Sequence, residues 1–180
     1  MGSQNASLND QDKAFIAEQK MFFIASSSGE EVNLSPRGYD CFKITGDNEA
    51  VFLDYAGSGN RTARDSAAHG EITIMFCSFT DNPMILRLFC KGETIDKKDT
   101  ELQELFHSSD LKGMRQFIKL TIYCVEHSCG MSVPRYEFIN QRNDLKEWCH
   151  DEDRAGRLDG YIQRKLIPLD LSTFKPGKNV

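Results

Sequence analysis

The clearest indication of how this chain folds is the segment Val51-Phe52-Leu53-Asp54-Tyr55-Ala56-Gly57-Ser58-Gly59-Asn60-Arg61-Thr62. Its apolar beginning, Val51 to Leu53, predicts a β-strand, and residues 57–60 predict a loop with little side-chain bulk. A helix is predicted from Arg61 to about Ala68, where His69-Gly70 ends it. The loop therefore offers a phosphate group free amide N–H groups, a hydroxyl and a guanidinium. It is not a nucleotide P-loop, because no Lys-Ser/Thr follows the last glycine, and a simple turn capped by Asn60 is the alternative.

The segments on both sides of this stretch predict antiparallel strands. Residues 21–25 and 32–38 form one predicted pair around a turn, and residues 71–79 and 84–92 form a second. Residues 117–127 alternate with a period of two, which places Cys124 on the apolar face of a further strand and Val125 on the other face. Sequential antiparallel strands favour a mainly β fold with a closed sheet, although an open α+β sheet is also compatible with the pattern.

Helices are predicted at both ends of the chain, and the length favours one domain over residues 1–180. The first helix spans Leu8 to Gln19, with Phe15 and Ile16 facing inward. A second helix at about 143–150 has Leu145 and Trp148 as apolar anchors. The predicted organisation is a core at about 10–130, a C-terminal helical extension at about 140–166 and a loose tail at 167–180.

The composition excludes several classes of function. Apolar residues make up 39% and charged residues 27% of the 180 residues, as in ordinary globular proteins. The net charge of −5 argues against a nucleic-acid partner. No apolar run approaches the roughly 20 residues of a membrane span, and the N-terminus does not resemble a secretory signal. We therefore expect a cytoplasmic protein with neither a membrane nor a nucleic-acid partner.

The six cysteines do not form a zinc-binding pattern, since the chain has no Cys-x-x-Cys pair. Cys124, His127 and Cys129 lie close together in the sequence, and Cys149 and His150 could complete a ligand set. The spacings are not those of zinc sites, so no metal is predicted. A thiol- or metal-dependent enzyme that uses the first three of these residues remains an alternative.

Four motifs resemble the FMN-binding split barrels related to pyridoxamine 5′-phosphate oxidase. They are Val-Asn-Leu-Ser-Pro-Arg-Gly at 32–38, Gly-Ser-Gly-Asn-Arg-Thr at 57–62, Ile-Leu-Arg-Leu-Phe-Cys-Lys-Gly at 85–92 and Ser-Cys-Gly-Met-Ser-Val-Pro-Arg-Tyr-Glu-Phe at 128–138. The resemblance covers about residues 10–150. It implies a split β-barrel with short helices, FMN as cofactor, and a homodimer with FMN in the groove between two subunits. It points to an oxidase-related subgroup, because residues 161–171 replace the Trp-Arg-x-x-x-x-Arg-type segment with which the vitamin B6 enzymes bind pyridoxamine phosphate.

The resemblance also implies which residues bind the phosphate of FMN. Arg37 takes the place of the family's phosphate lysine, and Arg61 that of its loop arginine. Val32 and Thr62 fall where the family has an arginine and a lysine, so two of the four expected cations are missing here. Either the expected affinity for FMN is lower, or backbone N–H groups and three side chains compensate for the missing cations: Ser58, Asn60 and Thr62.

Further contacts to the flavin ring and the substrate follow from the same resemblance. Arg87 matches a glutamine that touches the ring, where its charge would stabilise the anionic reduced flavin and raise the reduction potential. The alternatives for Arg87 are solvent exposure or pairing with a carboxylate. Leu53, Asp54 and Tyr55 would border the ring mainly through backbone groups. Asp54 is either a general base or, preferably, a cap of the adjacent loop. The remaining candidates are Ser128 and Cys129 for the cofactor, contributed by the partner subunit, and Arg135 and Tyr136 for the substrate.

These observations predict an FMN-dependent oxidoreductase that acts on an unidentified small molecule, with no catalytic residue identified. The alternatives are a flavin- or haem-binding module without turnover and the thiol- or metal-dependent enzyme described above.

Overall fold

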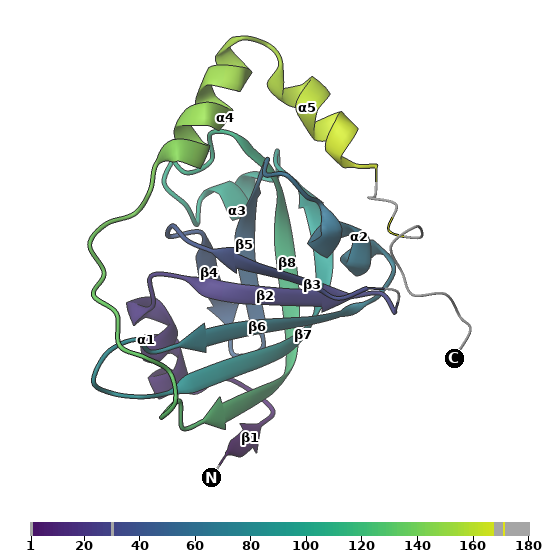
Figure 1. The fold of residues 1–180 in the computed structure, drawn as a ribbon. Helices are drawn as coiled ribbons and strands as arrows, with labels where there is room; N and C mark the ends of the chain where they lie inside the picture. Colours follow the sequence, from purple (N-terminus) through teal and green to yellow (C-terminus); the bar gives the residue numbers. More distant parts are fainter. Residues whose placement is uncertain (1, 30, 168–170, 172–180) are drawn as a thin grey trace.

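The computed structural model describes residues 2–29, 31–167 and 171, and within them the fold is mainly antiparallel β. One sheet has the strand order β3-β2-β6-β7-β8-β5-β4, and β1 pairs with β8 outside this path (Figure 1). The strands are β1 Ser3–Asn5, β2 Phe22–Ser27, β3 Asn33–Arg37, β4 Phe42–Gly46, β5 Glu49–Tyr55, β6 Glu71–Cys77, β7 Ile85–Asp96 and β8 Met114–Ser128. The helices are α1 Asp10–Glu18, α2 Arg61–Ala67, α3 Thr100–Gln103, α4 Asp144–Arg154 and α5 Leu158–Lys165. The predicted mainly β architecture with peripheral helices is confirmed.

The register of the sheet separates an inner face from an outer face. Ile24 of β2, Ile74 of β6 and Leu88 of β7 are cross-strand neighbours, and all three side chains are fully buried in the core. Because side chains alternate along a strand, the neighbouring row points the other way. That outer row contains Met75 and Arg87, which are only partly buried.

A β-bulge in β8 overturns part of the predicted alternation. Phe89 pairs with Cys124 but the next residue, Cys90, pairs with Ile122, which leaves Tyr123 without a partner on β7. Such an extra residue shifts every later side chain to the opposite face. Val125 is consequently fully buried and Cys124 is partly exposed, so the predicted faces of these two residues were wrong.

The helices α4 and α5 lie together at one end of the sheet, away from α1 and β1 (Figure 1). Cys149, not the predicted Trp148, is the buried anchor of α4, and Trp148 instead packs its ring against Tyr161 of α5. Cys149 fits closely over Gly113, which has a φ of +76° and where any Cβ would overlap the Cβ of Cys149. A small cluster of Ala56, Cys149, Leu158 and Ile162 fixes both helices against the end of β5.

No helix among residues 2–29 and 31–167 is long and apolar enough to cross a membrane. The predicted loose tail at 167–180 lies, apart from Ile167 and Leu171, outside the residues that the structure describes.

Candidate functional site

A cavity of about 600 Å³ lies between β3 and the loop that leads from β5 into α2. Its volume is within the range of about 300–1,000 Å³ that is typical of small-molecule sites. Its polar lining comes from two segments that are distant in sequence: Asn33, Ser35 and Arg37 on one side, and Ser58, Arg61 and Thr62 on the other. No carboxylate or imidazole is among the described residues that line it.

The loop is held open by hydrogen bonds from the strand β8. The Nη2 of Arg115 donates to the carbonyl oxygens of Gly59 at 2.8 Å and Tyr55 at 3.1 Å. Gln116 donates its amide to the Asn60 side chain at 3.1 Å. Asn60 occupies the N-cap position of α2 but makes no side-chain capping bond, so the capped-turn alternative is wrong. The N–H of Gly57 donates to Tyr55 O at 2.7 Å, and a Cβ at Gly59 would have nothing within 4 Å.

Asp54 lies buried behind the loop and holds two arginines. Its Oδ2 accepts from Arg115 Nε at 3.1 Å and from Gln116 Nε2 at 2.9 Å, and its Oδ1 lies 3.5 Å from Arg37 Nη2. The predicted role of Asp54 as a loop cap is therefore wrong. With its side chain 3% exposed and both oxygens engaged, it also has no face toward the cavity for general-base chemistry.

The charges around the cavity leave room for an anion. Arg37, Arg61 and Arg115 carry three positive charges against the one negative charge of Asp54, and Arg61 has no ion pair within the described part of the chain. The Nε of Arg37 and the Nη1 of Arg115 are buried without a hydrogen-bond partner there. A buried, unpartnered donor costs about 1–3 kcal/mol, so an acceptor that reaches either one is favoured. A phosphate monoester, which carries close to two negative charges at pH 7, matches this donor set, and the residues present fit the phosphate of FMN.

Three of the predicted cofactor residues contribute to the cavity differently from the others. Asn60 is not among the residues that line it. Thr62 borders it, but the residue is 3% exposed and its Oγ1 accepts from Asn33 at 3.3 Å. The Leu53 side chain is buried in the core, and its N–H donates to Cys41 O at 2.9 Å. Leu53 is therefore a core residue beside the site.

The predicted ring contacts form a second group, centred on Arg87. Its Nη1 donates to Glu126 at 3.1 Å and to the Ser128 hydroxyl at 3.0 Å, so the carboxylate-pairing alternative holds in this chain. Cys129 follows directly and is exposed.

The two groups lie on opposite faces of the sheet. Arg37 is the cross-strand neighbour of Phe22, which points into the core. Phe23, the next residue, lies in the outer row with Met75 and Arg87. A single chain therefore does not bring Arg87 toward the cavity that Arg37 lines.

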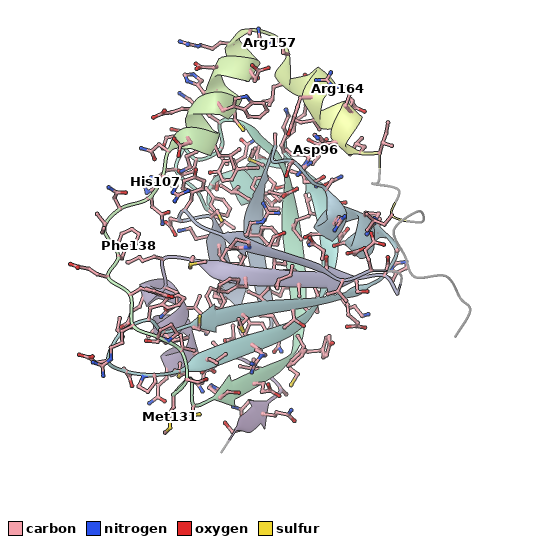
Figure 2. All side chains as sticks on the ribbon, in the orientation of Figure 1. Asp96, His107, Met131, Phe138, Arg157 and Arg164 are labelled. Carbon is pink, nitrogen blue, oxygen red and sulfur yellow. The ribbon has the colours of Figure 1, made fainter. Side chains whose placement is uncertain are left out.

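The substrate candidates belong to the irregular segment between β8 and α4, whose course Figure 2 marks with the labels Met131 and Phe138. Arg135 forms an exposed ion pair with Asp81 at 2.8 Å, and Tyr136 packs on Phe79 with ring centroids 5.4 Å apart. Both side chains are exposed and lie beside the turn between β6 and β7.

The residues of the thiol or metal alternative do not converge. His127 Nε2 lies 2.6 Å from the buried Asp12, and Cys124 is an outer-face neighbour of Phe89. Within the described ranges, no three His, Cys, Asp or Glu side chains are grouped as a metal site. Burial raises the pKa of the Cys41 thiol to about 12 and raises that of Cys149 as well, which makes both thiols poor nucleophiles.

Arg115 and Gln116 are the site residues that sequence reasoning missed. The alternation that predicts the strand begins at Phe117, and neither residue belongs to a motif. Only the pairing of Asp54 with Gln116 across β5 and β8 brings them to the loop.

Comparisons with known proteins show the family and the fold to which this chain is similar. The sequence profile of the family described as pyridoxamine 5′-phosphate oxidase matches residues 8–129. The pyridoxamine 5′-phosphate oxidase family protein ustO of Aspergillus flavus is 31% identical over 172 residues, which cover 90% of this chain and 69% of that protein. Among solved structures, HupZ of Group A Streptococcus matches with a TM-score of 0.53 and 13% identity, over 64% of this chain and 89% of that one. A Clostridium acetobutylicum protein related to general stress protein 26, of the pyridoxinephosphate oxidase family, matches with a TM-score of 0.52 and 11% identity, over 68% and 88% of the two chains. These structural likenesses confirm the predicted split-barrel fold.

Proposed function

This chain belongs to the pyridoxamine 5′-phosphate oxidase family, and from that premise we propose that it binds FMN and carries out redox chemistry on a small molecule. The observation that carries the proposal is the cavity beside the loop 57–60, which Arg37 and Arg61 line. Behind it, the buried Asp54 pairs with Arg37 and Arg115. In this proposal Arg37 and Arg61 bind the phosphate, Ser58 and Thr62 offer hydroxyls, and Arg115 positions the loop.

FMN supplies hydride and electron transfer at its ring when it is bound. The chain contributes binding and orientation. No acid or base among the described residues lines the phosphate cavity, so the protein groups there hold the cofactor and leave proton transfer to other parts of the site.

We propose that the complete site forms between two copies of the chain. Arg87 and Ser128 lie on the outer face of the sheet, opposite to the face toward which Arg37 points. The outer face also carries partly exposed apolar side chains, including Phe23, Met75 and Phe89, which a second copy would cover. A homodimer with two-fold symmetry would place the Arg87 group of each copy beside the phosphate cavity of its partner.

Titration with FMN and with riboflavin, followed by the quenching of flavin fluorescence, tests the proposal. Riboflavin is the matched control because it has the same ring and lacks the phosphate. We expect FMN to bind at least about tenfold more tightly, the difference that one hydrogen bond to a charged group makes. Equal affinities for the two compounds would mean that the cavity does not bind the phosphate of FMN. If neither compound binds, the proposal is overturned.

A flavin- or haem-binding module without turnover is the second candidate. It is favoured by the lack of an acid or base along the described lining of the cavity. Anaerobic mixing of the FMN-loaded protein with reduced nicotinamide cofactors separates the two functions. Bleaching of the flavin absorbance, with recovery on exposure to oxygen, supports the oxidoreductase; a spectrum that does not change supports the module. The substrate and the cytoplasmic location stay predictions.

A further inference from the structure

A second cavity, of about 280 Å³, lies on the other side of the loop that borders the FMN cavity. We call it the distal cavity. Ser58, Gly59 and Arg61 line both cavities, so the loop forms the ridge between them. The far wall of the distal cavity comes from α5, which lies beyond the residues 8–129 that match the family profile. We infer that the distal cavity is a second phosphate subsite.

The charge of the distal cavity carries this inference. Arg61, Arg64, Arg164 and Lys165 line it, and no carboxylate does so among the described residues. Arg64 is already neutralised by Glu31 at 2.9 Å and Asp65 at 3.1 Å. The other three cations have no ion pair with any residue in the described ranges. Arg164 also contributes to the lowered pKa of Glu152, a carboxylate that is itself paired with Arg157. Several positive charges around one concave surface, in a chain of net charge −5, produce a local field that favours an anion.

Packing contacts fix the position of α5, the helix that carries Arg164 and Lys165. Leu158 and Ile162 are buried against Ala56, which directly precedes the loop. Lys97 reaches Asp159 at 3.7 Å, which ties α5 to the residues after β7. Figure 2 labels Arg164 on this helix, at the same end of the molecule as the loop. The helix therefore brings Arg164 and Lys165 into the lining of the same cavity as Arg61.

The shape of the ridge determines which phosphate compounds are suitable. Gly59 has no side chain, and the space around its Cβ direction is open for 4 Å. Two phosphate groups joined in a diphosphate could therefore lie on the two sides of the ridge and share Arg61. The phosphate in the distal cavity would come either from the outer half of a flavin dinucleotide or from a separate phosphorylated ligand. Only the first source rests on the proposed function.

The test compares the double variant Arg164→Ala/Lys165→Ala with Arg154→Ala/Lys98→Ala. The control pair removes the same net charge from exposed positions outside both cavities. The affinities of both variants and of the unmodified protein are measured for FMN, FAD and ADP, by fluorescence quenching and calorimetry. We expect the first variant to lose about tenfold or more in affinity for ADP or FAD, as for a lost hydrogen bond to a charged group. Its affinity for FMN should change less than about threefold, and the control variant should bind all three compounds as the unmodified protein does.

The outcomes separate the sources and the two proposals. A loss for FAD alone identifies a tethered dinucleotide, and a loss for ADP identifies a separate phosphorylated ligand. If FMN binds while the double variant retains full affinity for FAD and ADP, the distal subsite is overturned and the proposed function stands. If ADP binds through Arg164 and Lys165 while FMN does not bind, the subsite stands and the proposed function falls. If none of the three compounds binds, both are overturned.

Discussion

Asp54 shows how one buried carboxylate organises the phosphate cavity. It fixes Arg115, which holds the loop, and it lies beside Arg37, which lines the cavity. Asp54→Asn would leave Arg115 buried without its counter-charge, and removing one partner of a buried pair costs about 3–5 kcal/mol. We expect the free energy of unfolding, measured by urea denaturation, to fall by about this amount.

The control for this prediction is Asp151→Asn. Asp151 pairs with Arg154 on the surface of α4, where a pair contributes about 0–1 kcal/mol. Equal losses for the two variants would mean that the Asp54 pair has no structural role.

Arg61 is the residue that both cavities share, and its charge has no partner among the described residues. Arg61→Ala is expected to weaken FMN binding by about 1.5–3 kcal/mol, the contribution of a hydrogen bond to a charged group. Because the Arg61 side chain forms no hydrogen bond or ion pair with any residue that the structure describes, the free energy of unfolding should change little. Riboflavin affinity serves as the internal control in the same fluorescence titration. A folded variant with full FMN affinity would remove Arg61 from the phosphate site.

The cysteines differ in their accessibility, which makes the packing testable without a ligand. Cys129 is exposed, whereas Cys41 and Cys90 are buried and their pKa values are raised by desolvation, that of Cys41 to about 12. At pH 8 we expect a disulfide reagent to modify Cys129 rapidly in the folded protein and to reach the buried thiols only after unfolding. Mass spectrometry of the labelled peptides checks the order. Rapid labelling of Cys41 or Cys90 in the folded Cys129→Ser variant would contradict it; Cys124, which is partly exposed, is followed separately.

At this scale the sequence predicts local chemistry better than distant contacts. Arg61 and Ser58 could be recognised because the glycine-bounded loop and the helix start are adjacent in the chain. Arg115 could not, since it reaches Asp54 across 61 positions through strand pairing. Asp54 was interpreted from its neighbours in the sequence, and its partners lie on other strands.

Among the contacts between elements, the close packing of Cys149 in α4 against Gly113 is the most sensitive to substitution. Gly113→Ala combines a left-handed backbone, which costs about 1–2 kcal/mol for an L-residue, with overpacking against Cys149, which adds typically about 1–3 kcal/mol. The free energy of unfolding is expected to fall by the sum, about 2–5 kcal/mol, in urea denaturation.

Gly156→Ala is the matched control for Gly113→Ala. Gly156 has a similar φ of +69° but nothing within 4 Å of the added Cβ, so only the backbone cost applies. Similar losses at the two positions would show that α4 does not depend on this close contact.

The elements themselves followed largely from periodicity, and the failures have physical causes. The strands β2, β6 and β7 alternate cleanly because one face is buried and the other is not. In β8 the bulge at Tyr123 breaks the alternation, and a bulge depends on the partner strand. The sequence predicts Trp148 as an anchor of α4, but the close approach to Gly113 admits only a small side chain, and Cys149 takes that place.

The fold of the whole molecule could be predicted because four motifs occur in the order of a known family, and the profile match over residues 8–129 confirms that family. Periodicity could not predict where the four motifs lie relative to one another in the folded chain. The motif around Arg37 and the motif around Arg87 lie on opposite faces of one sheet, so their cooperation requires a second copy.

Mixing two defective variants tests whether each site combines residues from two copies. Arg61→Ala removes the proposed phosphate contact, so this variant alone should have a low affinity for FMN. Arg87→Gln removes the proposed ring contact, so this variant alone should have a lowered flavin reduction potential. When the two are unfolded together and refolded, half of the dimers are mixed. Each mixed dimer has one site with both arginines intact, which restores roughly a quarter of all sites. A redox titration of the bound flavin should then show a fraction with the potential of the unmodified protein. If Arg61 and Arg87 serve the same site from one chain, mixing restores no such fraction, and the two-copy arrangement is wrong.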